Sequence, residues 1–479
     1  MADDREQALR RASELGLEFL AGLSERHVGA LTDDTGLVAK LGGQLPDEGE
    51  DPVTVVEQMA RDFDPGLVAT AGPRYFGFVI GGQLPAAAGA DWLTGAWSQN
   101  ANLHPLSPAA AAAELVVGPW MLDLLGLPPD ASFGFPTGAA LGSAVGLAVG
   151  RHVVLERIGW DVEARGLYGA PEIQVIVGEE VHSTLLTGLQ YLGLGRERVT
   201  RIPSDEQGRM RADALPAALD ASLPTIVAIQ AGNVNTGAFD PAEAVADALA
   251  GHPNAWLHVD GAFGLWAAAS PELRHLVAGV ERADSWATDA HKWLNVGYDC
   301  GFVAVRDQAA HRAAMMSAKA AYLMQDEAHR DNWEYVFDSS RRARGFIVYA
   351  ALRSLGRNGV REMIERSCHL ARRMAERLGA AEGVEILNDV VLNQVLVRFT
   401  PPGGGDADAF TREVMARVQT EGEAWMGGTT WHGMGAMRIS VSNWSTTEAD
   451  IDRTAAAILR AAGTQRRSPS PRPLRPASV

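Results

Sequence analysis

The sequence is poor in features that mark several large classes of protein. It has two cysteines, Cys300 and Cys368, in 479 residues, and neither belongs to a Cys-x-x-Cys pair. Two cysteines cannot build a disulfide framework, so we expect a reducing, cytoplasmic setting. Residues 1–6 are mostly charged, unlike a signal peptide, and no apolar run reaches the length that spans a bilayer. We therefore expect a globular protein without a membrane partner.

Basic residues are also scarce relative to acidic ones. Lys and Arg number 42 and Asp and Glu number 59, which gives a formal net charge of −17. Nucleic acids and anionic membranes both reward clustered basic residues, so neither is an expected partner. The chain has no G-x-x-x-x-G-K-[ST] motif and no G-x-G-x-x-G after a predicted strand. It also lacks H-E-x-x-H spacing, so we predict no metal site.

The apolar pattern predicts an α/β fold. Apolar residues make up 47% and charged residues 21% of the chain, as in an average globular protein. Between about residues 111 and 305, apolar runs alternate with helical stretches, which predicts a mostly parallel sheet with helices on both faces. The predicted helices are 109–125 and 141–155, and the predicted strands are 172–177, 225–230, 255–259 and 301–305.

The length allows two or three folding units. Residues 1–108 form a helical N-terminal segment, and its amphipathic stretch 4–23 needs a cover from this chain or from a partner subunit. We predict a large domain over 109–345, a smaller C-terminal α/β domain over 346–462, and a disordered tail rich in Pro, Arg and Ser over 463–479. In the small domain the helix 341–378 breaks around Gly356 and Gly359, and two strands, 391–398 and 436–441, follow it.

Lys292 has an unusual setting for a lysine. It stands between His291 and Trp293 and precedes the small-residue run 297–301. A lysine kept from bulk water is a nucleophile toward aldehydes. The alternative is an ordinary solvated lysine, which is the more common case for a single residue.

Two further polar residues follow predicted strands. Asp260 comes directly after strand 255–259, and His182 comes shortly after strand 172–177. Ligands of open α/β sheets bind at the carboxyl ends of strands. Asp260 is equally well explained as a helix N-cap, and His182 as a structural histidine.

Two other features could bind anions. The run 134–143 is rich in Gly and Ala and precedes a predicted helix, whose N-terminal N–H groups could hold a phosphate; tight packing of helix on sheet explains it equally well. Arg438 lies among apolar neighbours in a predicted strand and needs a carboxylate or another anion. A structural salt bridge would satisfy it too.

Together these residues follow the logic of a pyridoxal phosphate site. Lys292 would hold the cofactor as an imine, Asp260 would keep its ring nitrogen protonated, and His182 would stack on the ring. The helix near residue 141 would offset part of the phosphate charge.

The sequence resembles the group II pyridoxal-phosphate-dependent decarboxylases, the family of aromatic amino acid, histidine and glutamate decarboxylases, from about residue 71 to 459. The residues that carry the resemblance are Gly72–Phe78, Ser107-Pro108, Val181–Thr184, Gly232–Pro241, His258–Ala262 and Asp289–Asn295. It implies the fold-type-I PLP-dependent transferase fold and decarboxylation of an L-amino acid to an amine and CO₂. It also implies a homodimer with the active site at the subunit interface and with the N-terminal segment 1–108 packed on the partner subunit.

The resemblance also implies roles for individual residues. Lys292 is the implied Schiff-base lysine, with Asp260 and His182 at the cofactor ring. The further implied cofactor contacts are Asn235 and Ala262 and, around the phosphate, Ala139, Ala140, Asp289 and His291. We predict Phe76, His104 and Arg438 as substrate contacts, although each could equally be a packing residue.

One feature of the family is missing at its expected place. Members carry a mobile-loop tyrosine that returns a proton to the substrate, and alignment places Asn332 there. Tyr335 or Tyr322 could substitute, and we take Tyr335 as the candidate. Without such a tyrosine, the same fold could instead form an aldehyde with oxygen or make a carbon–carbon bond. A third alternative is a silent protein that binds pyridoxal phosphate without turnover.

Overall fold

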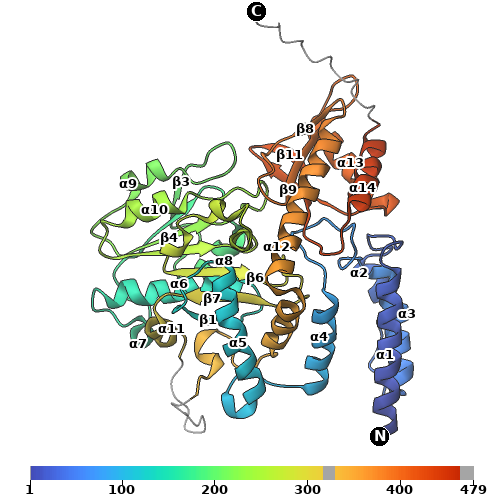
Figure 1. The fold of residues 1–479 in the computed structure, drawn as a ribbon, viewed down its shortest axis with the longest axis horizontal. Coiled ribbons are helices and arrows are strands. Elements are labelled where there is room, and N and C mark those ends of the chain that lie inside the picture. The colour runs from blue at the N-terminus through green and yellow to red at the C-terminus, as the bar shows by residue number, and fades with distance from the viewer. Residues whose placement is uncertain (1, 317–328, 464–479) are drawn as a thin grey trace, which may run out of the picture.

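A computed structural model of the chain describes residues 2–316 and 329–463, which form a two-domain body with N-terminal helices beside it (Figure 1). The N-terminal segment holds the helices α1 (Ala2–Gly22), α2 (Asp34–Leu41), α3 (Pro52–Phe63) and α4 (Pro85–Trp97). Helices α1 and α3 pack on each other, and α4 packs on the long helix α12 (Arg344–Gly379) of the body. The expected disordered tail lies outside the described residues, apart from its first residue, Gly463.

The large domain contains a seven-stranded sheet in the order β1-β7-β6-β5-β4-β2-β3. All strands run parallel except β7, which is antiparallel to β1 and β6. The strands are β1 (Ser132–Gly134), β2 (Gln174–Gly178), β3 (Val199–Ile202), β4 (Thr225–Gln230), β5 (Ala255–Asp260), β6 (Ser285–Asp289) and β7 (Gly301–Val305). The helices are α5 (Pro108–Leu124), α6 (Ala139–Glu156), α7 (Val162–Arg165), α8 (Ser183–Tyr191), α9 (Leu215–Ala218), α10 (Ala242–Leu249) and α11 (Gln308–Met315).

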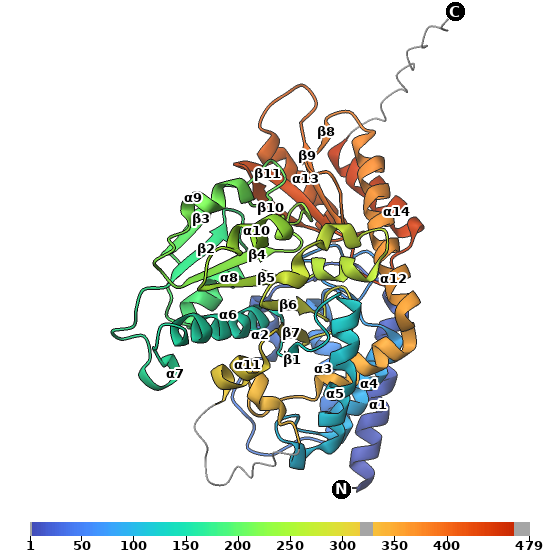
Figure 2. The same ribbon diagram turned by 60° about the vertical axis from the view of Figure 1, so that its left-hand side comes forward.

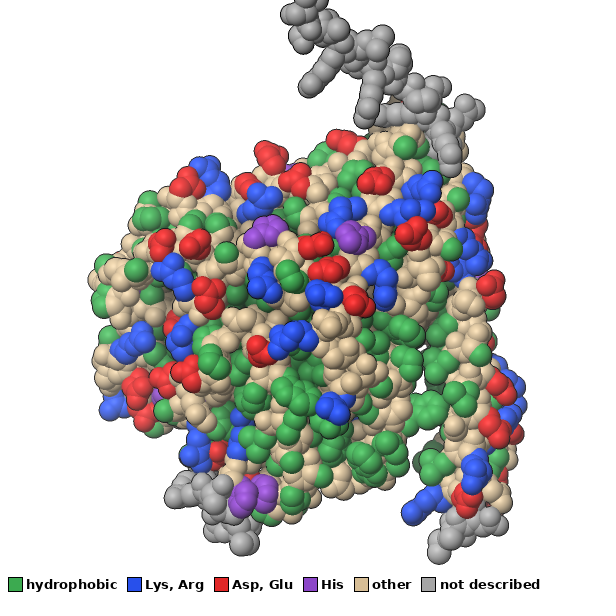
Figure 3. All heavy atoms as spheres, in the orientation of Figure 1, with side chains coloured by type: hydrophobic (Ala, Val, Ile, Leu, Met, Phe, Trp, Pro, Cys, Tyr) green, Lys and Arg blue, Asp and Glu red, His purple; other side chains and the backbone are tan. Residues whose placement is uncertain are grey.

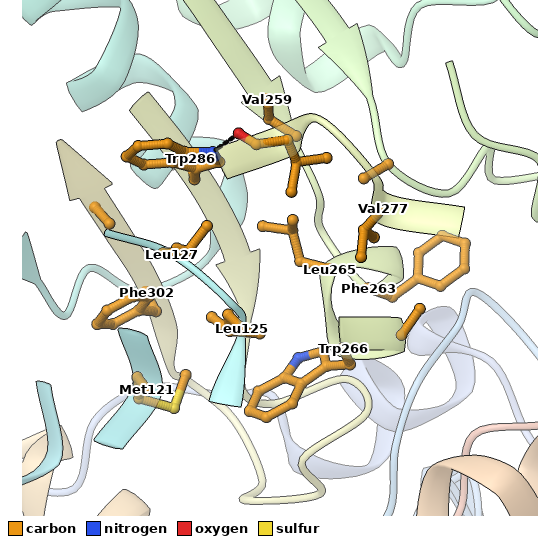
Figure 4. Close-up of a cluster of buried hydrophobic side chains, with 14 of the residues drawn as sticks. Met121, Leu125, Leu127, Val259, Phe263, Leu265, Trp266, Val277, Trp286 and Phe302 are labelled. Carbon is orange, nitrogen blue, oxygen red and sulfur yellow. Dashed lines mark hydrogen bonds between the residues drawn. The ribbon is translucent and has the colours of Figure 1, made fainter. Parts of the chain in front are cut away.

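Helices cover both faces of this sheet, as Figure 2 shows. Strand β5 alternates between the two faces, as every strand must. Trp256 belongs to the apolar cluster under α6 and α8, whereas Leu257 and Val259 belong to the cluster on the other face. The second cluster includes Trp286, whose indole Nε1 donates to the Val280 carbonyl at 2.7 Å (Figure 4). Burying each such side chain contributes about 1.5–3 kcal/mol.

Helix α6 approaches the sheet unusually closely. Gly142, Gly146 and Gly150 recur every four residues and therefore lie on one face of the helix. A Cβ on Gly146 would lie 2.7 Å from His258 Nδ1, and one on Gly150 would lie 2.6 Å from Trp256 Cδ1. By length and composition α6 could cross a membrane, which our sequence expectation overlooked, but 72% of it is buried inside the protein, as in a core helix.

The small domain is built on a four-stranded antiparallel sheet in the order β10-β11-β9-β8. Its strands are β8 (Val384–Ile386), β9 (Gln394–Phe399), β10 (Gly427–Trp431) and β11 (Met434–Ser440), and its helices are α12 (Arg344–Gly379), α13 (Ala407–Glu421) and α14 (Glu448–Ala462). Within α12 the backbone departs from helical geometry at Gly356 alone, with φ of 60°. The predicted interruption at Gly359 does not occur.

Candidate active site

The carboxyl edge of the large sheet forms the wall of a cavity of about 220 Å³. The ends of β5 and β6, the turn after β2 and the beginning of α6 all contribute to it. Eight of the predicted site residues line this cavity, namely Ala139, Ala140, His182, Asp260, Ala262, Asp289, His291 and Lys292. The sheet thus gathers groups that are up to 153 residues apart in sequence, counting from Ala139 to Lys292.

Asp260 is the last residue of β5 and is 7% exposed. One carboxylate oxygen accepts a hydrogen bond from the Ala262 N–H at 3.2 Å. Burial raises the pKa of Asp260, while His182, when its ring is protonated, and the Lys292 ammonium oppose that rise. A cation placed against this carboxylate would offset the cost of burying its charge.

His182 caps the N-terminus of α8. Its Nδ1 lies 3.3 Å from the Thr184 backbone nitrogen and 2.7 Å from Thr184 Oγ1. Because the backbone N–H donates to Nδ1, a proton on the neutral ring belongs on Nε2. Burial lowers the pKa of His182; Asp260 opposes this shift, and the charges of Lys292 and Arg438 add to it. The result is a neutral flat ring facing the cavity.

Lys292 lies on a loop that hydrogen bonds hold in place. The backbone N–H groups of Ala290 and His291 both donate to the Cys300 carbonyl at 3.0 Å. The ammonium Nζ of Lys292 lies 2.9 Å from Asp289 Oδ2. The lysine therefore enters the cavity from a fixed backbone, and it does so next to a carboxylate.

The N-terminus of α6 closes the cavity on another side. Gly138 is its N-cap residue and has no side chain with which to cap the helix. The N–H of Ala139 donates to Asp289 Oδ1 at 2.5 Å, and the next N–H groups have no partner inside the helix. Backbone N–H groups at the beginning of a long buried helix form a natural anion site.

Five predicted residues do not line the cavity: Phe76, His104, Asn235, Tyr335 and Arg438. Arg438 lies close enough for its charge to lower the pKa of His182. Asn235 accepts a hydrogen bond from Thr429 of the small domain at 3.0 Å. The His104 ring stacks on His329, with 3.9 Å between ring centroids.

Two of these residues lie in packed cores. Phe76 is 1% exposed and packs in the core of the small domain, because its backbone pairs with Trp425 and Ser440. Tyr335 is 4% exposed, and its ring meets His311 edge-on, with 5.2 Å between centroids. Both rings thus fill cores and are not presented to the cavity.

The loop tyrosine of the family has no counterpart at its aligned place. Asn332 is 2% exposed and belongs to a short 3₁₀ turn, Asn332–Tyr335, that packs against the body. Tyr322 lies outside the described residues. The aligned position is therefore a packing position in this chain.

Sequence reasoning missed several lining residues. Thr184, Gln230 and Phe263 all face the cavity. Thr184 belongs to the Val181–Thr184 motif, and its hydroxyl fixes the His182 ring, so the motif contained a usable signal. Tyr298 lies next to the cavity, with its ring centroid 4.5 Å from that of His291, and it stands in the small-residue run after Lys292.

Comparison with known proteins agrees with this geometry. Residues 36–400 match the family model described as the pyridoxal-dependent decarboxylase conserved domain. The human acidic amino acid decarboxylase GADL1 is 27% identical over 368 residues, which cover 75% of this chain and 69% of that protein.

Solved structures share the fold. The crystal structure of Oryza sativa TDC with PLP and tryptamine has a TM-score of 0.90 and 24% identity, and covers 97% of this chain and 98% of that one. The Rhodiola rosea 4-hydroxyphenylacetaldehyde synthase has a TM-score of 0.83 and 24% identity, covering 94% and 97%.

The fold and the cavity define a pyridoxal-phosphate-dependent enzyme of fold type I. Within that class, the chain belongs to the pyridoxal-dependent decarboxylase family, because the family model matches most of its length. It is accordingly an amino acid decarboxylase, a carboxy-lyase whose cofactor is pyridoxal 5′-phosphate.

Proposed function

We propose that Lys292, Asp260 and His182 bind the cofactor in the cavity at the carboxyl edge of the large sheet, where an L-amino acid loses its α-carboxylate. The observation that supports this most strongly is that these three residues line one cavity together with the α6 N-terminus. When bound, pyridoxal phosphate supplies a conjugated ring that accepts the electron pair left on Cα as CO₂ departs.

Each wall of the cavity fits one part of the cofactor. The α6 N-terminus offers backbone N–H groups to the phosphate, and Gly138, Ala139 and Ala140 leave room for it. The buried Asp260 carboxylate would hold a proton on the ring nitrogen, since a cation there stabilises its charge. The neutral His182 ring would stack on the cofactor and help to keep water out of the cavity.

Arg438 would bind the substrate carboxylate. Burial lowers the pKa of Arg438, and no ion pair of Arg438 occurs among residues 2–316 and 329–463. Arg438 is partly buried, a setting in which an anion stabilises a guanidinium, and its planar fork matches a carboxylate in two hydrogen bonds. Because Lys292 already pairs with Asp289, Arg438 is the cation available to a substrate.

The surroundings favour an aromatic substrate side chain. Tyr75 stacks on Trp425 with 5.1 Å between ring centroids, and Phe78 lies 5.3 Å from the same ring. Burial raises the pKa of Tyr75 to about 12, and Tyr298 contributes to that rise. We call Tyr75, Phe78, Tyr298 and Trp425 the aromatic cluster. An acidic side chain would need a second free cation, whereas an aromatic one could pack on the exposed members of this cluster, Phe78 and Tyr298, which are 59% and 58% exposed.

We also propose that two copies of the chain form the enzyme. Large apolar side chains are exposed on the N-terminal helices and on the body beside them: Leu9, Leu17, Val55, Met59, Phe63, Trp92, Leu93, Trp97, Leu115 and Val116. Figure 3 shows the broad hydrophobic area of the body that lies next to these helices. Apolar surface of this extent marks an interaction site. Light scattering should give twice the chain mass of 51.0 kDa.

The location proposed for the protein is the cytoplasm. Both cysteines are free and buried. Burial raises the pKa of each thiol to about 12, so neither is a reactive thiolate. This fits a compartment in which disulfides do not form.

A substrate panel tests the function directly. CO₂ release should be fastest with tryptophan, tyrosine or phenylalanine, and at least tenfold slower with glutamate, aspartate or cysteine sulfinate. Faster release from an acidic amino acid would refute the aromatic assignment. Each assay should be run with and without oxygen, because peroxide together with aldehyde would indicate the oxidative reaction instead. No turnover of any amino acid would favour the silent binding protein.

A further inference from the structure

The carboxylate of Asp289 stands where the cofactor phosphate is expected. Its Oδ1 accepts the first N–H of α6, from Ala139, at 2.5 Å, and its Oδ2 lies 2.9 Å from Lys292 Nζ. His291 Nε2 lies 3.5 Å from Oδ1. The same carboxylate thus caps the helix that should hold the phosphate and neutralises the lysine that should hold the cofactor aldehyde.

Asp289 cannot easily move away. It is 3% exposed and ends β6. Its backbone N–H donates to the Ala262 carbonyl at 2.9 Å, and its own carbonyl accepts from Trp266 Nε1 at 3.1 Å. A Cβ on Gly138 would lie 3.1 Å from Oδ1, so the helix N-terminus fits closely around the carboxylate. The side chain is held at the end of α6 by both neighbouring segments.

An ionised carboxylate has no proton to donate to a phosphate. The sequence prediction made Asp289 a phosphate contact, but the observed geometry makes it a second anion in the same subsite. Like charges a few ångströms apart in a buried site repel each other strongly. A phosphate that binds the remaining N–H groups of α6 must therefore do so against the charge of Asp289.

We propose that Asp289 is a resident anion that stabilises the empty pocket and weakens the binding of phosphorylated cofactor, so that the cofactor remains exchangeable. The inference rests on the proposed phosphate subsite at α6. Without the charge of Asp289, the cofactor-free pocket would be less stable, because Lys292 would lose its partner. The cofactor-bound pocket would be more stable, because the phosphate would no longer be repelled. Both changes favour binding, so they add and do not cancel.

The test compares cofactor affinity in apoprotein of the full chain. Pyridoxal phosphate is titrated into the wild type, Asp289→Asn and Asp307→Asn, and the bound fraction is followed by absorbance and by equilibrium dialysis. Asp307→Asn is the matched control, because Asp307 also caps a helix N-terminus, accepting from the Ala310 N–H at 3.0 Å, but the helix that it caps is α11. Asparagine keeps an acceptor oxygen for the Ala139 N–H, removes the charge, and replaces the oxygen that faces Lys292 with an NH2 donor; Asp289→Ser, which carries no amide, separates the loss of charge from the gain of that donor.

The expected result is a dissociation constant at least tenfold lower for Asp289→Asn and unchanged for Asp307→Asn. Pyridoxal, which lacks the phosphate, should gain less from Asp289→Asn, because only the loss of the lysine pair remains. Equal or weaker binding of pyridoxal phosphate by Asp289→Asn would overturn the proposal and restore Asp289 as a phosphate contact. If Asp289→Asn improved the affinity for pyridoxal as much as that for pyridoxal phosphate, the result would overturn the proposed repulsion between Asp289 and the phosphate.

A second variant covers the case in which Asp289→Asn does not fold. Asp289→Ser is also neutral and keeps a hydroxyl for the helix end, and the same tenfold gain is expected. If neither variant folds, the carboxylate is required by the fold and the proposal fails. If the wild type itself binds no pyridoxal phosphate, the proposed cofactor site fails. If the wild type binds it but the Asp289 variants show no gain in affinity, only the proposal about Asp289 fails.

Discussion

Gly81 packs its Cα directly against the carbonyl oxygen of Lys292, and a Cβ at this position would overlap that oxygen. The segment that carries Gly81 is also tied to the lysine loop by the Gly82 N–H, which donates to Asn295 Oδ1 at 2.6 Å. One hydrogen bond and one close contact therefore fix where the Lys292 backbone lies.

We predict that Gly81→Ala lowers activity by about 10²-fold, because a displacement near 1 Å at a catalytic group has that effect. The measurement is kcat together with the absorbance of lysine-bound cofactor. Gly89→Ala is the control, since Gly89 lies in α4 with no atom near its Cβ position. That control should keep full activity and gain about 0.5–1 kcal/mol of stability. Full activity of Gly81→Ala would show that the contact does not position Lys292.

Asp260→Asn should remove the charge that holds the ring-nitrogen proton. We expect kcat to fall on the order of 10²-fold, while the protein still binds cofactor through Lys292 and α6. Spectrophotometric titration separates the two effects. A variant that retains wild-type kcat would contradict the role of Asp260.

Arg438→Lys should weaken substrate binding, because an ammonium cannot replace the two-pronged contact of a guanidinium. A hydrogen bond between charged groups contributes about 1.5–3 kcal/mol, so kcat/KM should fall roughly 10- to 100-fold. Arg398→Lys is a suitable control, because Arg398 on the neighbouring strand pairs with Asp408 at 2.7 Å. Equal effects of the two substitutions would assign Arg438 a purely structural role.

His311 makes stability sensitive to acid. Both ring nitrogens are bonded, to Ser132 Oγ at 2.7 Å and to the Tyr335 carbonyl at 3.0 Å. Burial, with help from the charge of Arg330, lowers its pKa from 6.5 to about 3. The unfolded chain binds a proton below pH 6.5 and the folded one does not, so stability falls as the pH drops from 6.5 toward 3.

Lowering the pH from 7.5 to 5.5 should decrease the free energy of unfolding by about 1.4 kcal/mol through His311 alone. In urea denaturation, His311→Gln should show a pH effect that is smaller by about that amount, although its stability at pH 7.5 is also expected to decrease. The exposed His275→Gln serves as the control. An identical pH effect in the wild type and His311→Gln would contradict the assignment.

Much of the fold was predictable because it depends on local patterns. The apolar runs at 225–230 and 301–305 are fully buried strands with the predicted limits. The runs at 132–134, 199–202 and 285–289 were not predicted as strands. Residues 132–134 form a strand only by pairing with β7, and that pairing joins residues 173 apart, Ser132 and Val305. A window of local sequence cannot contain such information.

The candidate site was predictable where strand ends carry polar residues, as at Asp260. It was not predictable where tertiary packing decides what a side chain touches. Phe76 and Tyr335 have the chemistry of substrate or proton contacts, but backbone pairing and ring packing bury them elsewhere. The pair formed by Asp289 and Lys292 could be suspected from a spacing of three residues. Its contact with α6 joins residues 150 apart, Ala139 and Asp289, so only the family resemblance, which puts both residues around the phosphate, indicated that they lie close together.

The proposed function depends above all on Lys292 as the residue that holds the cofactor. The chain contains three lysines, Lys40, Lys292 and Lys319, so peptide mapping gives a clear answer. The holoenzyme is reduced with borohydride, which fixes cofactor to the lysine that carries it, and is then digested and analysed by mass spectrometry. We predict the pyridoxyl label on the peptide with Lys292 alone and its loss in Lys292→Ala. A label on Lys40 or Lys319, or no label in a protein that releases CO₂, would contradict the account.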